Sequence, residues 1–299
     1  MNIRSRYFIL MVFLCIATVS CKQDKKPSNS KLDKELEVEL DTTDKVVKFQ
    51  NSLFSVPSPY QLSILIKDIG SNYNSELLNP AENYKLYTSL FKKSINLGIY
   101  GADLGYLNIY KQAPSAITYF SIIKIMSQDL GLTSAINPNI MSRIENNIDN
   151  QDSLLFIMSN LYRDVDYYLK ESQRQREGTL VLAGGWIEAM NFLTKLAIES
   201  KNELLIQRVG ENKQPLENLI KILSPYYNES EDIKKLVDDL IDLSYEFDGV
   251  ETTYEFKAPT TIPQNRITKV HSISKIVVSE SVLKTIDTKV SNIRNSLIK

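Results

Sequence analysis

The sequence predicts an all-α protein, a multi-helix bundle of packed helical hairpins, with a small β-hairpin near the C-terminus. Three observations predict this fold class. First, Ser58-Pro59, Asn79-Pro80 and Asn137-Pro138 place proline after a residue that caps helices, and proline at the first helical position loses no hydrogen bond. Second, the stretch from Gly249 to Ile276 is rich in Thr, Val, Tyr and Phe, which favour strands. Third, apolar residues recur at alternating spacings of four and three, as on one buried helix face, at Leu154, Met158, Leu161, Val165 and Tyr168.

The first residues have the organisation of an export signal. Basic residues precede an apolar stretch over residues 7–19, and Ser20 stands directly before Cys21. The stretch is too short for a comfortable transmembrane helix. It is similar to the lipobox of bacterial lipoproteins, although Thr18 stands where leucine is usual. We therefore expect residues 1–21 to be a lipoprotein signal peptide and Cys21 to be lipidated, with an uncleaved anchor or plain secretion as the alternatives.

The residue after the cysteine bears on location. In the lipoprotein sorting schemes that this signal resembles, aspartate after the cysteine favours retention in the inner membrane, and here the residue is Lys22. We expect an outer-membrane protein, anchored by its lipid and facing the periplasm.

The mature chain divides into a tether and one domain. Residues 22–52 are rich in Lys, Asp, Glu, Ser and Thr, which is typical of a flexible tether. Residues 53–299 are expected to form a single helical domain, in which Ser279 caps a last helix that runs to about residue 298. Residues 253–256 are expected to pair with 270–276, or to form a long irregular crossover. The other helices are predicted at 80–97, 98–111, 115–130, 138–148, 152–176, 179–199, 203–209, 215–223 and 230–247.

Composition excludes several kinds of chemistry. Both cysteines, Cys15 and Cys21, lie in the signal, so the mature chain has no disulfide, thiolate nucleophile or cysteine metal site. His271 is the only histidine, which argues against a zinc enzyme or a serine triad. The chain has 35 basic and 36 acidic residues, without the positive charge of a nucleic-acid-binding protein. We predict no metal, no cofactor and no catalytic residue.

The run from Asn96 to Tyr110 is a candidate site. Glycines occupy one helix face and polar side chains an adjacent stripe: Gly98, Gly101, Gly105, Asp103, Tyr106 and Tyr110. Either a ligand lies in a groove and is recognised by Asp103 and the tyrosine hydroxyls, or another helix crosses closely and Asp103 is a buried hydrogen-bond acceptor. We favour the helix crossing, because close packing explains the glycine spacing without a ligand.

The run from Leu180 to Leu193 repeats this pattern with Gly184, Gly185, Trp186 and Glu188. Aligning the runs matches Gly101 with Gly184, either through duplication of a helical hairpin or by chance. A duplication would bring the two glycine faces together.

Basic residues separate the two runs. Arg174 and Arg176 precede Gly178, which we expect to end a helix in the left-handed conformation. Either arginine could pair with Asp103 or Glu188. The alternative, which we favour, is that they complement a helix C-terminus.

Three segments resemble an uncharacterised family of all-helical lipoproteins from Bacteroidota: SPYQLSILIKDIG (58–70), NLGIYGADLGY (96–106) and LAGGWIE (182–188). The resemblance implies an exported helical domain and implies no catalytic residues. The GxHxxE motif of the imelysin-like helical lipoproteins is absent from the sequence.

Two functional hypotheses follow. The first is a lipid-anchored binding or scaffold protein of the cell envelope, whose partner is an envelope protein or glycan. The alternative is a carboxylate-dependent glycan hydrolase with Asp103 and Glu188 as acid and base, which requires the two carboxyls about 5 to 9.5 Å apart across an open cleft. An open or a sealed position of these side chains distinguishes the hypotheses.

Overall fold

The computed structural model describes residues 47–49, 52–54, 72–132, 138–147, 150, 153, 157, 167–168, 171–262 and 266–299. All of them belong to one compact unit, Val46–Lys299. The predicted signal, Cys21, nearly all of the tether and the Ser58-Pro59 helix start lie outside the described residues. So do Leu154, Met158, Leu161 and Val165 of the predicted apolar stripe.

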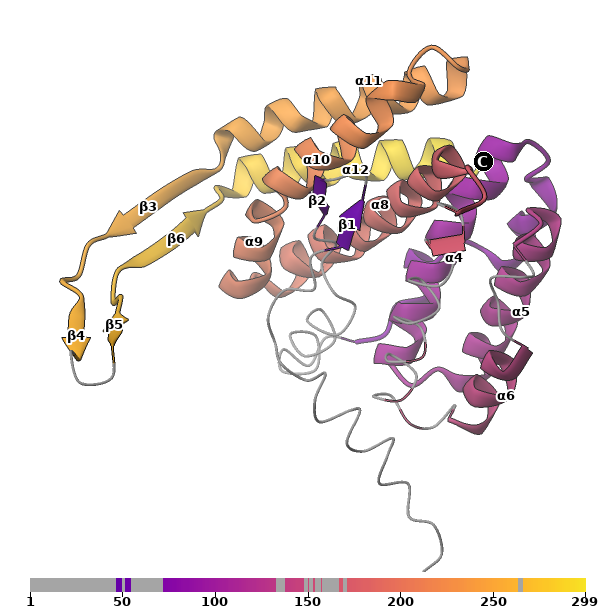
Figure 1. Cartoon of the computed structure of the whole chain (residues 1–299), viewed down its shortest axis with the longest axis horizontal. Coiled ribbons are helices and arrows are strands. Elements are labelled where there is room, and N and C mark those ends of the chain that lie inside the picture. Colours follow the sequence, from indigo (N-terminus) through magenta and orange to yellow (C-terminus); the bar gives the residue numbers. More distant parts are fainter. Residues whose placement is uncertain are drawn as a thin grey trace, which may run out of the picture. The chain divides into compact units, whose positions relative to one another are not determined.

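The predicted all-α fold is confirmed, and so is the small hairpin near the C-terminus (Figure 1). The α-helices of the described part are α4 (Leu90–Ile109), α5 (Ala113–Asp129), α6 (Pro138–Asn146), α8 (Gln175–Ser200), α9 (Glu203–Gly210), α10 (Lys213–Leu223), α11 (Glu231–Glu246) and α12 (Glu280–Leu297). Short 3-10 helices are η1 (Ser75–Leu77), η2 (Ala81–Leu86), η3 (Ser224–Tyr226) and η4 (Phe247–Gly249). No helix among the described residues combines the length and the apolar character needed to cross a membrane.

Side-chain caps fix several helix starts. Ser89, Ser230 and Ser279 accept a hydrogen bond from the third backbone N–H of α4, α11 and α12. Each cap satisfies a donor that the helix itself leaves free. The predicted start of the last helix at Ser279 is therefore confirmed.

Three predicted helix boundaries are wrong. The expected break between residues 97 and 98 falls inside α4, and Asn79-Pro80 precedes only the 3-10 helix η2. Gly98 serves helix packing and not helix termination. Similarly, Gly178 does not end a helix, because α8 begins at Gln175 and the left-handed residue before it is Gln173, with φ 57°.

Helices α4 and α8 run parallel in close contact. A Cβ atom on Gly98 would lie 1.9 Å from the backbone O of Val181, and a Cβ atom on Gly184 would lie 1.9 Å from the backbone O of Ile95. The approach is reciprocal, since each glycine meets the carbonyl three residues before the other. The expected meeting of the glycine faces is therefore present, but Gly98, and not Gly101, is the counterpart of Gly184.

Helix α12 lies antiparallel against α8. Its side chains bond successive positions of α8 in reverse order, with Arg294 on Glu188, Ser291 on Asn191 and Asp287 on Thr194. The apolar core beneath continues through α9, α10 and α11. A second apolar cluster joins α4 to α5 and α6.

A two-stranded arm connects α11 to α12. Strand β3 (Glu251–Glu255) pairs antiparallel with β6 (Ile273–Val277), and farther out β4 (Thr260–Ile262) pairs with β5 (Ile267–Lys269). The predicted pairing of 253–256 with 270–276 is thus present in a longer form. A separate hairpin joins β1 (Val47–Phe49) to β2 (Ser52–Phe54).

The glycine crossing predicts opposite effects at adjacent positions. Gly184→Ala should destabilise the fold by about 2 kcal/mol or more, because its Cβ would collide with a backbone carbonyl that cannot rotate away. Gly185→Ala is the matched control. Its Cβ would lie 3.5 Å from the backbone O of Gly98, an ordinary contact, and alanine improves helix propensity by up to about 1 kcal/mol. Denaturant unfolding measures both variants, and equal stability of the two would contradict the close crossing.

Candidate functional site

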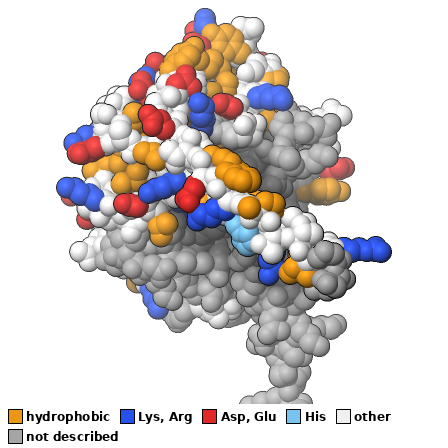
Figure 2. Space-filling model, turned by 90° about the vertical axis from the view of Figure 1, so that its left-hand side faces the viewer, with side chains coloured by type: hydrophobic (Ala, Val, Ile, Leu, Met, Phe, Trp, Pro, Cys, Tyr) orange, Lys and Arg blue, Asp and Glu red, His pale blue; other side chains and the backbone are white. Residues whose placement is uncertain are grey.

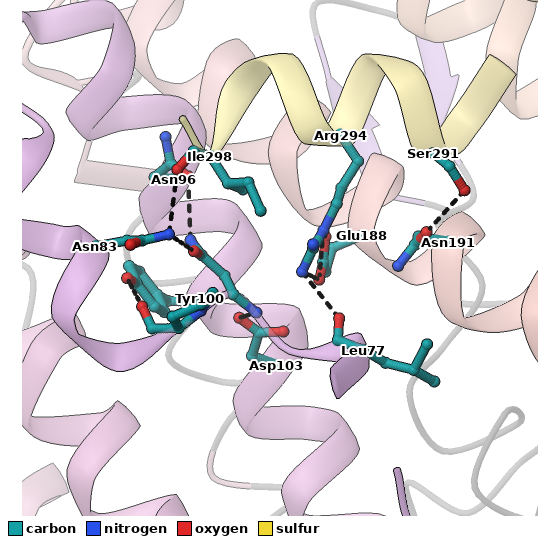
Figure 3. Close-up of polar contacts among 12 residues, drawn as sticks. Leu77, Asn83, Asn96, Tyr100, Asp103, Glu188, Asn191, Ser291, Arg294 and Ile298 are labelled. Carbon is teal, nitrogen blue, oxygen red and sulfur yellow. Dashed lines mark hydrogen bonds and ion pairs between the residues drawn. The ribbon is translucent and has the colours of Figure 1, made fainter. Parts of the chain in front are cut away.

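Asp103 and Glu188 meet in a buried polar cluster, which we define as Asn79, Asn96, Asp103, Glu188 and Arg294 (Figure 3). Helix α4 contributes Asn96 and Asp103, α8 contributes Glu188, and α12 contributes Arg294. Arg294 is 7% exposed and the other four side chains are fully buried. The parallel crossing of α4 and α8 brings the two acids together. Asp103 follows Gly98, and Glu188 follows Gly184, by about one helical turn.

Arg294 is the cation of the cluster. Its Nε donates to Glu188 Oε2 over 2.9 Å, and its Nη2 donates to Glu188 Oε1 over 2.8 Å. This two-bond geometry is the strongest that a guanidinium and a carboxylate form. Burial alone would lower the pKa of Arg294, but the Glu188 carboxylate raises it above its usual range. Burial also raises the pKa of Glu188, while the hydrogen bonds and the charge of Arg294 act to lower it. The two-bond contact therefore favours the ionised form of both groups.

Asp103 carries the other carboxyl of the cluster. Its Oδ2 accepts from the backbone N of Asn79 over 3.4 Å, whereas Oδ1 meets no N–H or hydroxyl donor among the described residues. Two adjacent buried carboxylates would repel each other strongly, so one of Asp103 and Glu188 carries a proton. Burial, and then the negative charge of Glu188, raise the pKa of Asp103 well above its usual range. Asp103 holds the proton, because Arg294 neutralises Glu188.

The cluster lies against the segment that joins η1 to η2, residues 77–80, of which Leu78 and Asn79 are buried. Arg294 Nη2 donates to the backbone O of Leu77 over 2.8 Å. Tyr119 donates to the backbone O of Asn79 over 2.7 Å, and Tyr100 donates to that of Pro80 over 2.9 Å. Burial raises the pKa of both tyrosines, so both remain donors. Buried backbone without such partners would be strongly destabilising.

The same region caps the C-terminal end of α12. Asn96 Nδ2 donates to the backbone O of Leu297 over 3.0 Å, and Tyr87 donates to the backbone O of Ile298 over 3.1 Å. The Asn79 side chain donates in turn to Tyr87 and to Asn96. The last carbonyls of a helix have no partner within it. Side-chain donors from α4 and from residues 79–87 therefore satisfy the last carbonyls of α12.

The remaining candidate residues lie apart from the two acids. Tyr106 stacks on Phe192 with ring centroids 4.5 Å apart, and Tyr110 lies 4.8 Å from Tyr106. Trp186 is fully buried and donates from Nε1 to Asn212 Oδ1 over 3.2 Å. Gly101 and Gly105 are buried within α4, while Gly185 on α8 is half-buried. The structure thus unites Asp103 and Glu188 but not the whole predicted set.

The arginines that the sequence suggested as partners for the acids bind elsewhere. Arg174 Nη1 donates over 2.6 Å to the backbone O of Leu130, which ends α5. Arg176 pairs with Glu177 and Glu229 at 2.9 Å. The favoured alternative for Arg174, the complement of a helix C-terminus, matches the structure, although the helix is α5 and not the preceding one. The partner of Glu188 is Arg294, which sequence reasoning missed.

This arrangement is suited to stability. Asp103 and Glu188 are sealed from solvent, whereas glycoside hydrolysis requires two carboxyls that flank a bound sugar. No group of three or more His, Cys, Asp and Glu side chains in the described part of the chain could hold a metal ion. His271 lies on the exposed arm, where its Nε2 is 3.0 Å from Thr260 Oγ1.

The proton on Asp103 predicts a distinctive pH dependence. A raised folded-state pKa means that the contribution of Asp103 is complete below its unfolded pKa of about 3.9 and is lost as the pH rises through the folded value. Asp103→Asn imitates the protonated acid at every pH. Its stability relative to the wild type should rise above pH 4 by up to about 1.4 kcal/mol per pH unit until the folded pKa is reached. Denaturant unfolding from pH 4 to 8 measures the difference, and a flat difference would show that Asp103 is ionised.

The ion pair predicts non-additive effects. Glu188→Gln leaves the Arg294 charge buried without its counter-ion and should cost about 3 to 5 kcal/mol. Arg294→Met removes the counter-ion of Glu188 and the hydrogen bond to the backbone O of Leu77. The double variant removes both charges, so it should cost clearly less than the sum of the single changes. Unfolding free energies of the three variants measure this coupling, and strict additivity would contradict the pair.

Comparisons of this chain with models of protein families, with curated proteins and with solved structures found no match.

Proposed function

We propose that the chain is a lipid-anchored binding or scaffold protein of the cell envelope. The proposal includes lipidation at Cys21 and a position on the outer membrane, facing the periplasm. The order of basic residues, apolar stretch, Ser20 and Cys21 supports this location. An envelope protein or a glycan is the proposed partner.

One observation favours binding over catalysis. Asp103 and Glu188, the acids of the two distinctive glycine runs, are fully buried and are bonded to Asn79 and Arg294. Buried acids that hold a fold together are not available to a substrate. This geometry gives no support to the alternative of a glycan hydrolase that uses these two carboxyls.

Binding is testable in intact envelopes. The full chain is expected to form reproducible cross-links to one envelope component when it is anchored. The Cys21→Ala chain, produced at the same level, is expected to lose them because it no longer concentrates at the membrane. Identical cross-links from both chains, or none above background, would contradict an anchored binding role.

The anchor itself is tested by its two cysteines. Cys21→Ala should abolish incorporation of labelled palmitate and release the chain from membranes, because it removes the atom that carries the lipid. Cys15→Ala is the matched control, since this residue lies within the apolar stretch and should leave labelling unchanged. Labelling of the Cys21→Ala chain would exclude this lipidation site.

A further inference from the structure

The arm, residues 251–277, exposes apolar side chains that have no core to enter. Tyr254 is 63% exposed, Phe256 69% and Val270 73%. At the usual rise of ~3.3 Å per residue, the five residues of β3 span about 17 Å. Figure 2 shows apolar and basic side chains around His271 on this side of the molecule. A two-stranded hairpin alone is only marginally stable in water, so pairing with a further strand would stabilise the arm.

The two faces of the arm differ in charge. Residues directly opposite in an antiparallel pair share a face, so Glu251 and Glu255 lie with Ile273, Lys275 and Val277. The other face carries Thr252, Tyr254, Ser274 and Ile276 and has no charge in this segment. Lys257 continues the charged face, since its Nζ lies 3.4 Å from Glu255 Oε1.

One edge of the arm is open. Strand β6 lies beside α9, where a Cβ on Gly210 would meet Ile276 Cγ2 at 2.5 Å. Strand β3 pairs with β6 on one side only, and every residue of β3 is exposed. Among the described residues, nothing pairs with the outer edge of β3, whose N–H and C=O groups are free to extend the sheet.

We propose that β3 pairs antiparallel with β3 of a second copy of this chain, centred on Tyr254, to form a four-stranded sheet. A two-fold axis through this position places Tyr254 beside Tyr254 of the second copy. Phe256 then faces Thr252 of the second copy on the uncharged side. The inference goes beyond the proposed function and does not require the lipid anchor.

Charge selects both the occupant and the register. Centred on Tyr254, the pairing places Glu251 opposite Lys257 of the second copy, twice by symmetry. Centring on Thr253 would oppose Glu251 with Glu255, and centring on Glu255 would oppose that residue with itself. Centring on Phe256 would bring Pro259, which has no N–H, into the ladder. Of these four registers, only the one centred on Tyr254 places opposite charges across the pair and keeps proline out of the ladder.

Cysteine cross-linking tests this register in the full chain. Residues 22–299 contain no cysteine, and opposed positions in a sheet have Cα atoms about 4.5 to 5.5 Å apart, within disulfide range. Tyr254→Cys should give at least tenfold more disulfide-linked dimer under mild oxidation than Ser274→Cys. Ser274 is the matched control, because it lies opposite Tyr254 on β6 and is exposed on the same face. The unsubstituted chain reports any dimer formed through Cys15 or Cys21.

A charge exchange separates self-pairing from other occupants. In the Tyr254→Cys background, Lys257→Glu should reduce the dimer severalfold, and Lys257→Glu with Glu251→Lys should restore it. Equal yields from Tyr254→Cys and Ser274→Cys, or failure of the exchange to restore the dimer, would overturn the proposal. Binding of the unsubstituted chain to anionic phosphatidylglycerol vesicles, lost with Lys257→Glu and without any Tyr254→Cys dimer, would overturn it in favour of a lipid surface. Far-UV circular dichroism of each variant verifies the helical fold, to which the exposed arm contributes no core residue.

Discussion

The fold depends on the need to satisfy buried backbone where no helix does so. Residues 77–80 link the 3-10 helices η1 and η2, with Leu78 and Asn79 buried, and the carbonyls of Leu77, Asn79 and Pro80 accept from Arg294, Tyr119 and Tyr100. Because these donors lie on α12, α5 and α4, the segment ties together helices that are far apart in sequence. A buried polar group without a partner costs about 1 to 3 kcal/mol, so loss of one donor affects several elements at once.

The charge state of the cluster follows from the number of its ions. One guanidinium meets two carboxyls in an interior that water does not reach, so one carboxyl remains neutral. Glu188 forms the two-bond contact with Arg294 and keeps its charge, whereas Asp103, whose pKa is raised by burial and by the charge of Glu188, remains protonated. The glycine crossing makes this arrangement possible, since larger residues at positions 98 and 184 would hold α4 and α8 apart.

Local signals predicted the elements better than their partners. Capping residues predicted the last helix, and the glycine spacing predicted a close crossing with a buried Asp103. The sequence did not reveal that Gly98, and not Gly101, lies at the crossing with Gly184. Both residues lie on the same face of α4, and only the position of α8 along α4 distinguishes them. Arg294 was missed because it is 106 residues from Glu188. A signal was nevertheless present, since Arg294 lies among the apolar positions Val290, Ile293 and Leu297 of its helix, where a charge needs a buried partner.

The core and the arm differ in what association can add. In the polar cluster, hydrogen bonds within the fold already meet the charges, so a partner would have to break them before it gained anything. On the arm, by contrast, a partner could bury apolar surface without breaking such bonds, because Tyr254, Phe256 and Val270 leave most of their surface in water. Each Å² of apolar surface that a partner covers contributes about 25 cal/mol. The acids that dominate the sequence patterns therefore explain how the domain holds together, and the exposed strand, which no catalytic pattern marks, is where binding free energy is still to be gained.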